Sequence, residues 1–188
     1  MIRALAILLL ASPAAAFDID YAQVMAENPD AITQTGESTR RADLPGDVHV
    51  IETTLSDGTT SYFGYDDSPA GAAGCTFGIL VDLTVATLAC PDMLEAAARD
   101  ALADNLDASA RFVAANTVPP VPPEGIDARL EAHIEARADA LRQTGLVCTP
   151  QEDPQLTAIV RAATNPAFRQ MLDRLHAVPR LPVASPCL

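Results

Sequence analysis

The alternation of apolar and polar positions is clearest between residues 48 and 65. The stretch VHVIETTL at residues 48–55 is rich in β-branched side chains, and TTSYFGY follows at residues 59–65. Between them stands Ser56-Asp57-Gly58. Three loop residues that end in glycine fit a type I turn followed by a bulge. The pattern therefore predicts a β-hairpin.

The turn also fixes the register of this hairpin. Directly opposed residues of an antiparallel pair lie on one face of the sheet. The predicted pairs are Thr53 with Ser61, Ile51 with Phe63, and His49 with Tyr65. Because Ile51, Leu55 and Phe63 then share a face, we expect that face to be the apolar, covered one, with His49 at its end.

A second hairpin is predicted at residues 75–90, CTFGILVDLTVATLAC. Two cysteines bracket this mostly apolar run, and a disulfide between them would set the strand register. Asp82 would lie in the turn. The polar stretch at residues 33–47, with Gly36, Pro45 and Gly46, reads as a loop. Together the two hairpins predict an antiparallel meander that is covered on one face.

The rest of the chain shows helical spacing of apolar residues. A short helix is expected within residues 17–31, and VPPVPP at residues 118–123 forms a rigid corner between two longer helices. The longer helices are predicted at residues 91–116, 124–145 and 156–163, and from Asn165 onward. The predicted fold class is α+β: a small antiparallel β-meander of two hairpins and about four strands, packed against three to four α-helices and held by two disulfides.

The first sixteen residues have the features of a secretory signal. Arg3 precedes the apolar run Leu5–Leu10, and small residues follow at Ala14-Ala15-Ala16. We expect cleavage after Ala16 and a periplasmic or secreted protein with no membrane span afterwards. The remaining chain, residues 17–188, is expected to form one domain with a β-rich part at 48–90, a helical part at 91–177 and an extended tail at 178–188.

Composition narrows the choice of partners. The chain has 12 basic and 25 acidic residues, a formal net charge of −13, and every basic residue is arginine. A field of this sign disfavours nucleic acid and anionic lipid as partners. The absence of lysine and the abundance of alanine suggest a GC-rich bacterial genome.

Four cysteines lie in the exported part of the chain: Cys75, Cys90, Cys148 and Cys187. An even number in an exported protein indicates disulfides, and no C-x-x-C motif suggests a redox role. Three pairings are possible. We favour Cys75–Cys90, because it fits the second hairpin, and Cys148–Cys187 by elimination.

No catalytic, cofactor or metal motif is recognisable. G-x-S-x-G and H-E-x-x-H are both absent from the sequence. The candidate functional residues are therefore few. His49 and Tyr65 face each other in the predicted hairpin, and the basic residues Arg169, Arg174 and His176 cluster near the end of an acidic chain.

Two functions are compatible with these observations. The first is a non-catalytic exported protein that binds a protein or a small ligand, or that serves an envelope assembly. The alternative is a small hydrolase-like enzyme that combines His49, His133 or His176 with carboxylates such as Glu52, Asp66 or Asp67. A deep pocket with a histidine and a carboxylate would favour the enzyme, and a flat surface with an apolar patch would favour the binding protein.

Overall fold

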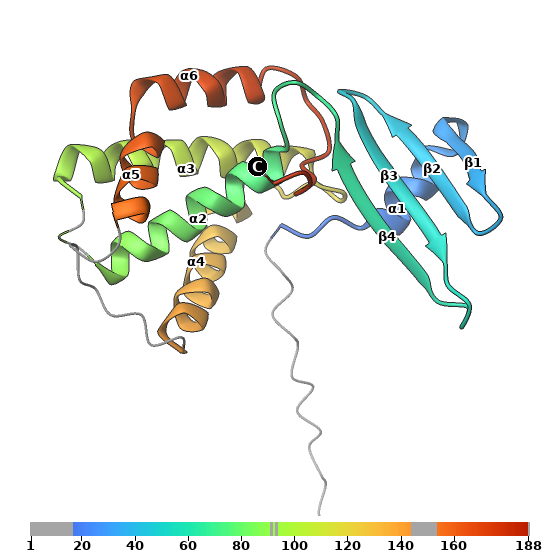
Figure 1. The fold of residues 1–188 in the computed structure, drawn as a ribbon, viewed down its shortest axis with the longest axis horizontal. Coiled ribbons are helices and arrows are strands. Elements are labelled where there is room, and N and C mark those ends of the chain that lie inside the picture. Colours follow the sequence, from blue (N-terminus) through green and yellow to red (C-terminus); the bar gives the residue numbers. More distant parts are fainter. Residues whose placement is uncertain (1–16, 91, 93, 144–153, 188) are drawn as a thin grey trace, which may run out of the picture.

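The computed structural model describes residues 17–90, 92, 94–143 and 154–187. These residues form an α+β fold with one four-stranded antiparallel sheet and six α-helices, as the sequence predicts. The sheet lies at one end of the molecule and the longer helices at the other (Figure 1). The short 3-10 helices Pro29–Ala31 and Pro123–Gly125 occur in the connections.

The sheet is a simple meander. Its strands follow one another in the order β1-β2-β3-β4, with bounds Ile32–Gly36, Thr39–Leu44, Val48–Thr54 and Thr60–Asp66. The predicted β3–β4 hairpin is confirmed, including its register: Thr53 faces Ser61, Ile51 faces Phe63, and His49 faces Tyr65.

The predicted loop at residues 33–47 is wrong, because this stretch supplies β1 and β2. β1 is an edge strand, and four of its five residues are exposed. In β2 only Ala42 is fully buried. Because β1 and β2 bury so little surface, they carry threonine, arginine and aspartate and lack the apolar alternation by which β3 is recognised in the sequence.

The prediction of the buried sheet face is also wrong. Val48 and Val50 are fully buried, whereas Phe63 is 52% exposed. The covered face packs against helix α1, Tyr21–Glu27, through Val24 and against the C-terminal tail through Val183. These two elements come from opposite ends of the described chain, so the hairpin sequence alone does not reveal which face they cover.

The predicted second hairpin is wrong: residues 75–89 lie in helix α2, Ala73–Ala89, and Cys90 is the C-cap of this helix. Helix α2 carries apolar side chains on nearly all of its sides, as expected for a helix packed between other helices. Three threonines donate their hydroxyl hydrogens to carbonyl oxygens three or four residues earlier, at 3.3, 2.8 and 2.9 Å: Thr76, Thr84 and Thr87. This bonding makes β-branched residues compatible with the helix.

Four further helices complete the helical half: α3, Ala96–Asn116; α4, Ile126–Gln143; α5, Pro154–Ala163; and α6, Pro166–Leu175. The sequence predicted that this helix starts at Pro91, whereas α3 begins at Ala96. Helix α2 packs against both α3 and α4. Leu80 and Val81 of α2 share a core with Leu102 of α3 and Leu172 of α6.

The expected pairing of cysteines is wrong. Cys75 is bonded to Cys187, with 5.2 Å between their Cα atoms, which excludes both Cys75–Cys90 and Cys148–Cys187. Helical geometry explains the first error. Fifteen residues of α-helix separate Cys75 from Cys90 by about 22 Å, whereas a disulfide needs Cα atoms within about 7 Å. Cys75–Cys187 is the disulfide that the described residues show. Cys148 lies outside the described residues.

The tail joins the two halves of the molecule. It first passes the start of α2, where Gly74 N donates to Val183 O at 3.0 Å, and then runs beside β4, where Asp66 N donates to Ser185 O at 2.8 Å. A Cβ atom at Gly74 would overlap with the backbone of Pro182 and Val183. The tail therefore lies directly on the first turn of α2.

In the part of the chain that the structure describes, no helix is both long enough and apolar enough to cross a bilayer.

Candidate functional site

Alternate residues of β2, β3 and β4 point away from α1 and the tail. We call this surface the open face, and its members are Arg41, Asp43, His49, Ile51, Phe63 and Tyr65. All six are exposed or partly exposed. Because the strands pair in register, these side chains form two rows across the sheet, Asp43–His49–Tyr65 and Arg41–Ile51–Phe63.

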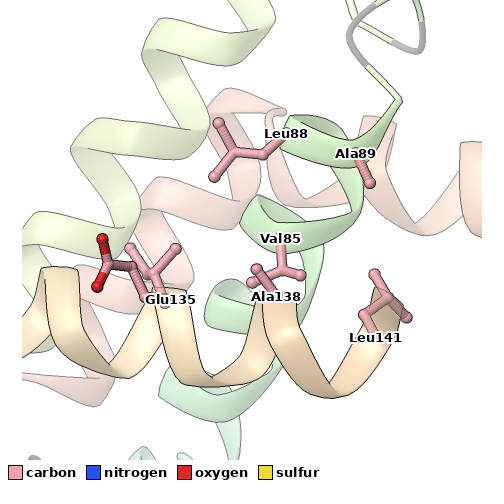
Figure 2. Close-up of a pocket in the computed structure, with 7 residues that line it drawn as sticks. Val85, Leu88, Ala89, Glu135, Ala138 and Leu141 are labelled. Atoms are coloured by element: carbon pink, nitrogen blue, oxygen red, sulfur yellow. The ribbon is translucent and has the colours of Figure 1, made fainter. Parts of the chain in front are cut away.

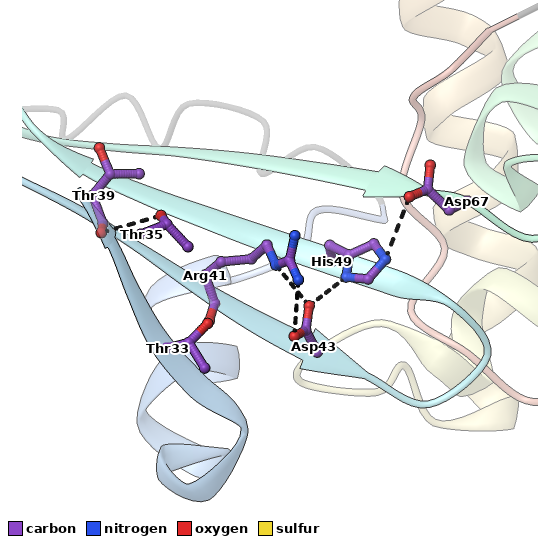
Figure 3. Close-up of polar contacts among 7 residues, drawn as sticks. All are labelled: Thr33, Thr35, Thr39, Arg41, Asp43, His49 and Asp67. Atoms are coloured by element: carbon purple, nitrogen blue, oxygen red, sulfur yellow. Dashed lines mark hydrogen bonds and ion pairs between the residues drawn. The ribbon is translucent and has the colours of Figure 1, made fainter.

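The first row holds an ordered polar chain (Figure 3). His49 Nδ1 lies 2.6 Å from Asp43 Oδ1. A carboxylate can only accept, so this contact assigns the proton to Nδ1. Arg41 holds the same carboxylate from the other side, with Nε 2.8 Å from Oδ1 and Nη2 donating to Oδ2 at 3.1 Å. The imidazole therefore has a fixed orientation.

These contacts also determine the charges of Arg41 and Asp43. Hydrogen bonds from Arg41 and then from His49 lower the pKa of the Asp43 carboxyl below its ordinary value. The same carboxylate raises the pKa of the Arg41 guanidinium. Both groups therefore stay ionised throughout the neutral range.

The other side of the imidazole is less closed. Asp67 Oδ2 lies 3.6 Å from His49 Nε2, and the Asp67 side chain is 64% exposed. This distance exceeds that of a hydrogen bond. When Nδ1 carries the only proton of a neutral ring, Nε2 is an acceptor. Two acceptors, Nε2 and the Asp67 carboxylate, then lie side by side at the solvent-facing edge of the open face.

Aromatic rings extend from this point across β4. The His49 and Tyr65 rings have centroids 4.8 Å apart and planes inclined by 31°. The Tyr65 and Phe63 rings are stacked at 6.2 Å with an interplanar angle of 21°. The three rings thus present a continuous π surface, and its outer member, Phe63, is half exposed.

The Asp43–His49 pair has the geometry of a base with an orienting carboxylate. A nucleophile would have to lie within about 3 Å of Nε2. Among the described residues, the ion-pair partner of Nε2 is the Asp67 carboxylate. A carboxylate has no proton for the imidazole to remove, so Asp67 does not act as the nucleophile of such a pair. The described residues also contain no group of three potential metal ligands.

The other predicted candidates lie elsewhere. Arg169 and Arg174 belong to α6, where Arg169 Nε donates to Asp173 Oδ1 at 3.0 Å. His176 caps that helix and stacks on Phe112 with ring centroids 4.6 Å apart. Burial lowers the pKa of His176. The structure thus brings His49 and Tyr65 together and places the three basic residues in the helical half.

A shallow apolar groove lies between α2 and α4 (Figure 2). Its volume is about 260 Å³, and it is lined by Val85, Leu88, Ala89, Ile134, Glu135, Ala138 and Leu141. Leu88 is 65% exposed. Among the described residues of this lining, Glu135 is the one that carries a charge, and these residues do not supply the converging polar groups of a catalytic centre.

A second cavity, of about 300 Å³, lies where the N-terminal segment meets α2 and α4. Phe17, Asp18, Phe77 and His133 are among its lining residues. The His133 ring lies 5.9 Å from that of Phe77 and 6.3 Å from that of Phe17. Burial is the main cause that lowers the pKa of His133. This histidine is therefore held neutral among aromatic rings.

Sequence reasoning found His49 and Tyr65 and named Asp67 among the carboxylates that could combine with a histidine, but it missed Arg41 and Asp43 as their neighbours. These two residues lie in β2, a stretch that the sequence predicted to be a loop. The usable signal was the two-residue spacing of Arg41 and Asp43 around the apolar Ala42, since such spacing places two side chains on one face of a strand.

Comparison with known proteins finds no matching family model, no matching curated protein and no matching solved structure.

Proposed function

We propose that this is an exported, non-catalytic binding protein, acting in the periplasm or outside the cell, and that its open face is the binding surface. The observation that carries the proposal is the π surface of Phe63, Tyr65 and His49, whose outer member, Phe63, is half exposed and which is held beside a fixed ion pair. A surface of this kind is preorganised, so a partner would immobilise few side chains on binding.

The composition of the open face supports the same function. Aromatic residues and arginine are enriched at the centres of protein interfaces. Phe63 is about half exposed, and Ile51, which lies opposite Phe63 on the open face, is partly exposed. Contiguous exposed apolar side chains rimmed by polar groups are typical of interaction sites.

Site-specific photo-crosslinking tests this proposal. A photo-reactive phenylalanine analogue is placed at position 63 of the exported protein, and in a second variant at Leu88 in the α2–α4 groove. Both side chains are exposed, so the second variant is a matched control. We expect a discrete adduct from position 63 that is absent from position 88. Equal adducts from both positions, or none from position 63, would contradict the proposal.

The alternative function is a small hydrolase-like enzyme. One observation favours it: the cavity at Phe17 and Phe77 is lined by a histidine and a carboxylate, His133 and Asp18. If this cavity were catalytic, His133→Gln would abolish hydrolysis of ester or amide substrates while the fold persists. A panel of such substrates with the unmodified protein and with this variant decides the question.

A further inference from the structure

We propose that the open face takes an arginine side chain from a basic, extended peptide, with the side chain lying along Phe63 and Tyr65 and its guanidinium donating to Asp67 and to His49 Nε2. This inference rests on the proposed function and names the chemistry of its ligand. It commits the surface to one kind of occupant, a cationic peptide.

Hydrogen-bonding capacity is the first argument. In the neutral imidazole, Nε2 accepts, and the Asp67 carboxylate 3.6 Å away accepts as well. A group that fits between them must donate to both. Guanidinium carries five N–H donors in a planar fork and no acceptor. It is therefore the side chain best suited to two neighbouring acceptors.

The aromatic rings are the second argument. Phe63 and Tyr65 alternate along β4 at a spacing of about 7 Å, and Asp67 follows directly after Asp66, the last residue of that strand. A guanidinium stacks on an aromatic face through its own plane and is attracted by the ring's negative quadrupole. Phe63 lies farther from Asp67 and leaves about half of its surface open for contact with the aliphatic part of the same side chain. One arginine side chain can thus lie on the rings while its end reaches Asp67.

The open face already contains one pair of the proposed kind. Arg41 is ion-paired with Asp43: Nη2 donates to Oδ2 at 3.1 Å, and Nε lies 2.8 Å from Oδ1. At the opposite end of the His49 ring, Asp67 has a described ion-pair contact only with His49. A partner arginine on Asp67 would reproduce the Arg41–Asp43 arrangement, so that His49 lies between two guanidinium-bound carboxylates.

Charge is the third argument. The chain has a formal net charge of −13, so its field attracts cationic ligands and repels anionic ones. On the open face the one arginine, Arg41, is bound to Asp43. Without a partner, the exposed charge at the edge is therefore that of Asp67.

The test uses a blocked Gly-Arg-Gly tripeptide and its citrulline counterpart. Citrulline has nearly the same shape but no charge. Binding to the complete mature protein is followed by amide chemical shifts, because single-residue probes bind with dissociation constants of about 1 mM. We expect the arginine peptide to shift resonances of residues 63–67 and 49, and the citrulline peptide to bind at least about fivefold more weakly.

Variants then locate the site. Asp67→Asn is expected to weaken the arginine peptide about three- to tenfold, and Phe63→Leu about two- to fivefold. Both side chains are at least half exposed, so these variants should fold. Asp104→Asn on α3 removes the same charge at another exposed position, and Leu88→Ala removes an exposed apolar side chain. Neither control should change the affinity by more than about 1.5-fold.

Each remaining outcome overturns the inference in a recognisable way. Equal binding of both peptides at the open face would show recognition of a neutral ligand, and would leave the proposed binding surface intact. An affinity unchanged in Asp67→Asn and Phe63→Leu would show that the site is elsewhere. No shift on the open face at millimolar peptide, together with a discrete crosslink from position 63, would reject the arginine ligand while retaining the proposed function.

Discussion

Arg180 Nε lies 2.8 Å from Asp66 Oδ2, and the two side chains are 3% and 0% exposed. The other ends of both groups are also held. Arg180 Nη2 donates to Gly71 O at 2.9 Å, and Asp66 Oδ1 accepts from Ser68 N at 2.8 Å. This ion pair therefore connects the tail to the end of β4 and to the connection that leads into α2.

Breaking this pair should destabilise the protein strongly. In Arg180→Met the carboxylate of Asp66 stays buried without its cation, and such a loss costs about 3–5 kcal/mol. The free energy of unfolding by urea measures the change. Arg174→Met removes an arginine from an exposed position of α6 and should change it by less than about 0.5 kcal/mol.

The double variant Asp66→Asn with Arg180→Met is a second check on the same pair. It removes both charges, so much of the lost stability should return. A loss in the double variant equal to the sum of the two single losses would mean that the buried groups do not act as a pair.

Two glycines of α2, one turn apart, should respond to alanine in opposite ways. At Gly74 a Cβ would collide with the backbone of the tail, whereas at Gly78 it meets no atom within 4 Å. Gly74→Ala must displace the tail, at a cost of about 1–3 kcal/mol. Gly78→Ala should instead stabilise the helix by about 0.5–1 kcal/mol. Equal effects in thermal unfolding would contradict the close contact between tail and helix.

Two histidines make the stability depend on pH. Burial, the largest cause, lowers the pKa of both His133 and His176 in the folded protein, and the positive charges of Arg137 and Arg169 add to the effect. The unfolded chain then binds more protons as the pH falls below about 6.5, the ordinary value for histidine. The free energy of unfolding therefore decreases as the pH falls through this value toward the folded pKa values.

Urea unfolding at several pH values between about 7.5 and 5 measures this decrease. His133→Phe keeps a ring beside Phe17 and Phe77 but cannot take a proton, so its decrease should be smaller than that of the unmodified protein. Parallel curves for the two proteins would show that His133 does not contribute.

The local part of the fold could be predicted from sequence. The Ser56-Asp57-Gly58 turn determines the β3–β4 register within seventeen residues, so Ile51 opposite Phe63 and His49 opposite Tyr65 followed from it. The buried face could not be predicted in this way, because Val24 of α1 and Val183 of the tail cover it from distant parts of the chain.

Helix α2 shows a different limit. A short run that is apolar on all sides has no period, and it suits a buried strand as well as a buried helix. The assumption that Cys75 and Cys90 pair then favoured the strand. This wrong strand assignment also concealed the site. The predicted meander was built from the hairpins at residues 48–65 and 75–90, so it did not include β2, which carries Arg41 and Asp43.

The account depends on the tail being fastened to α2 by Cys75–Cys187, since that bond holds the covered face of the sheet closed and leaves the other face free. The bond joins residues 112 positions apart, so removing it by Cys75→Ser with Cys187→Ser should cost about 4 to 5 kcal/mol.

Peptide mapping of the unreduced mature protein by mass spectrometry tests this claim most directly. We predict one linked pair of peptides that contain Cys75 and Cys187 and, by elimination, a second pair that contain Cys90 and Cys148. Peptides linked through Cys75 and Cys90, or through Cys148 and Cys187, would contradict the account.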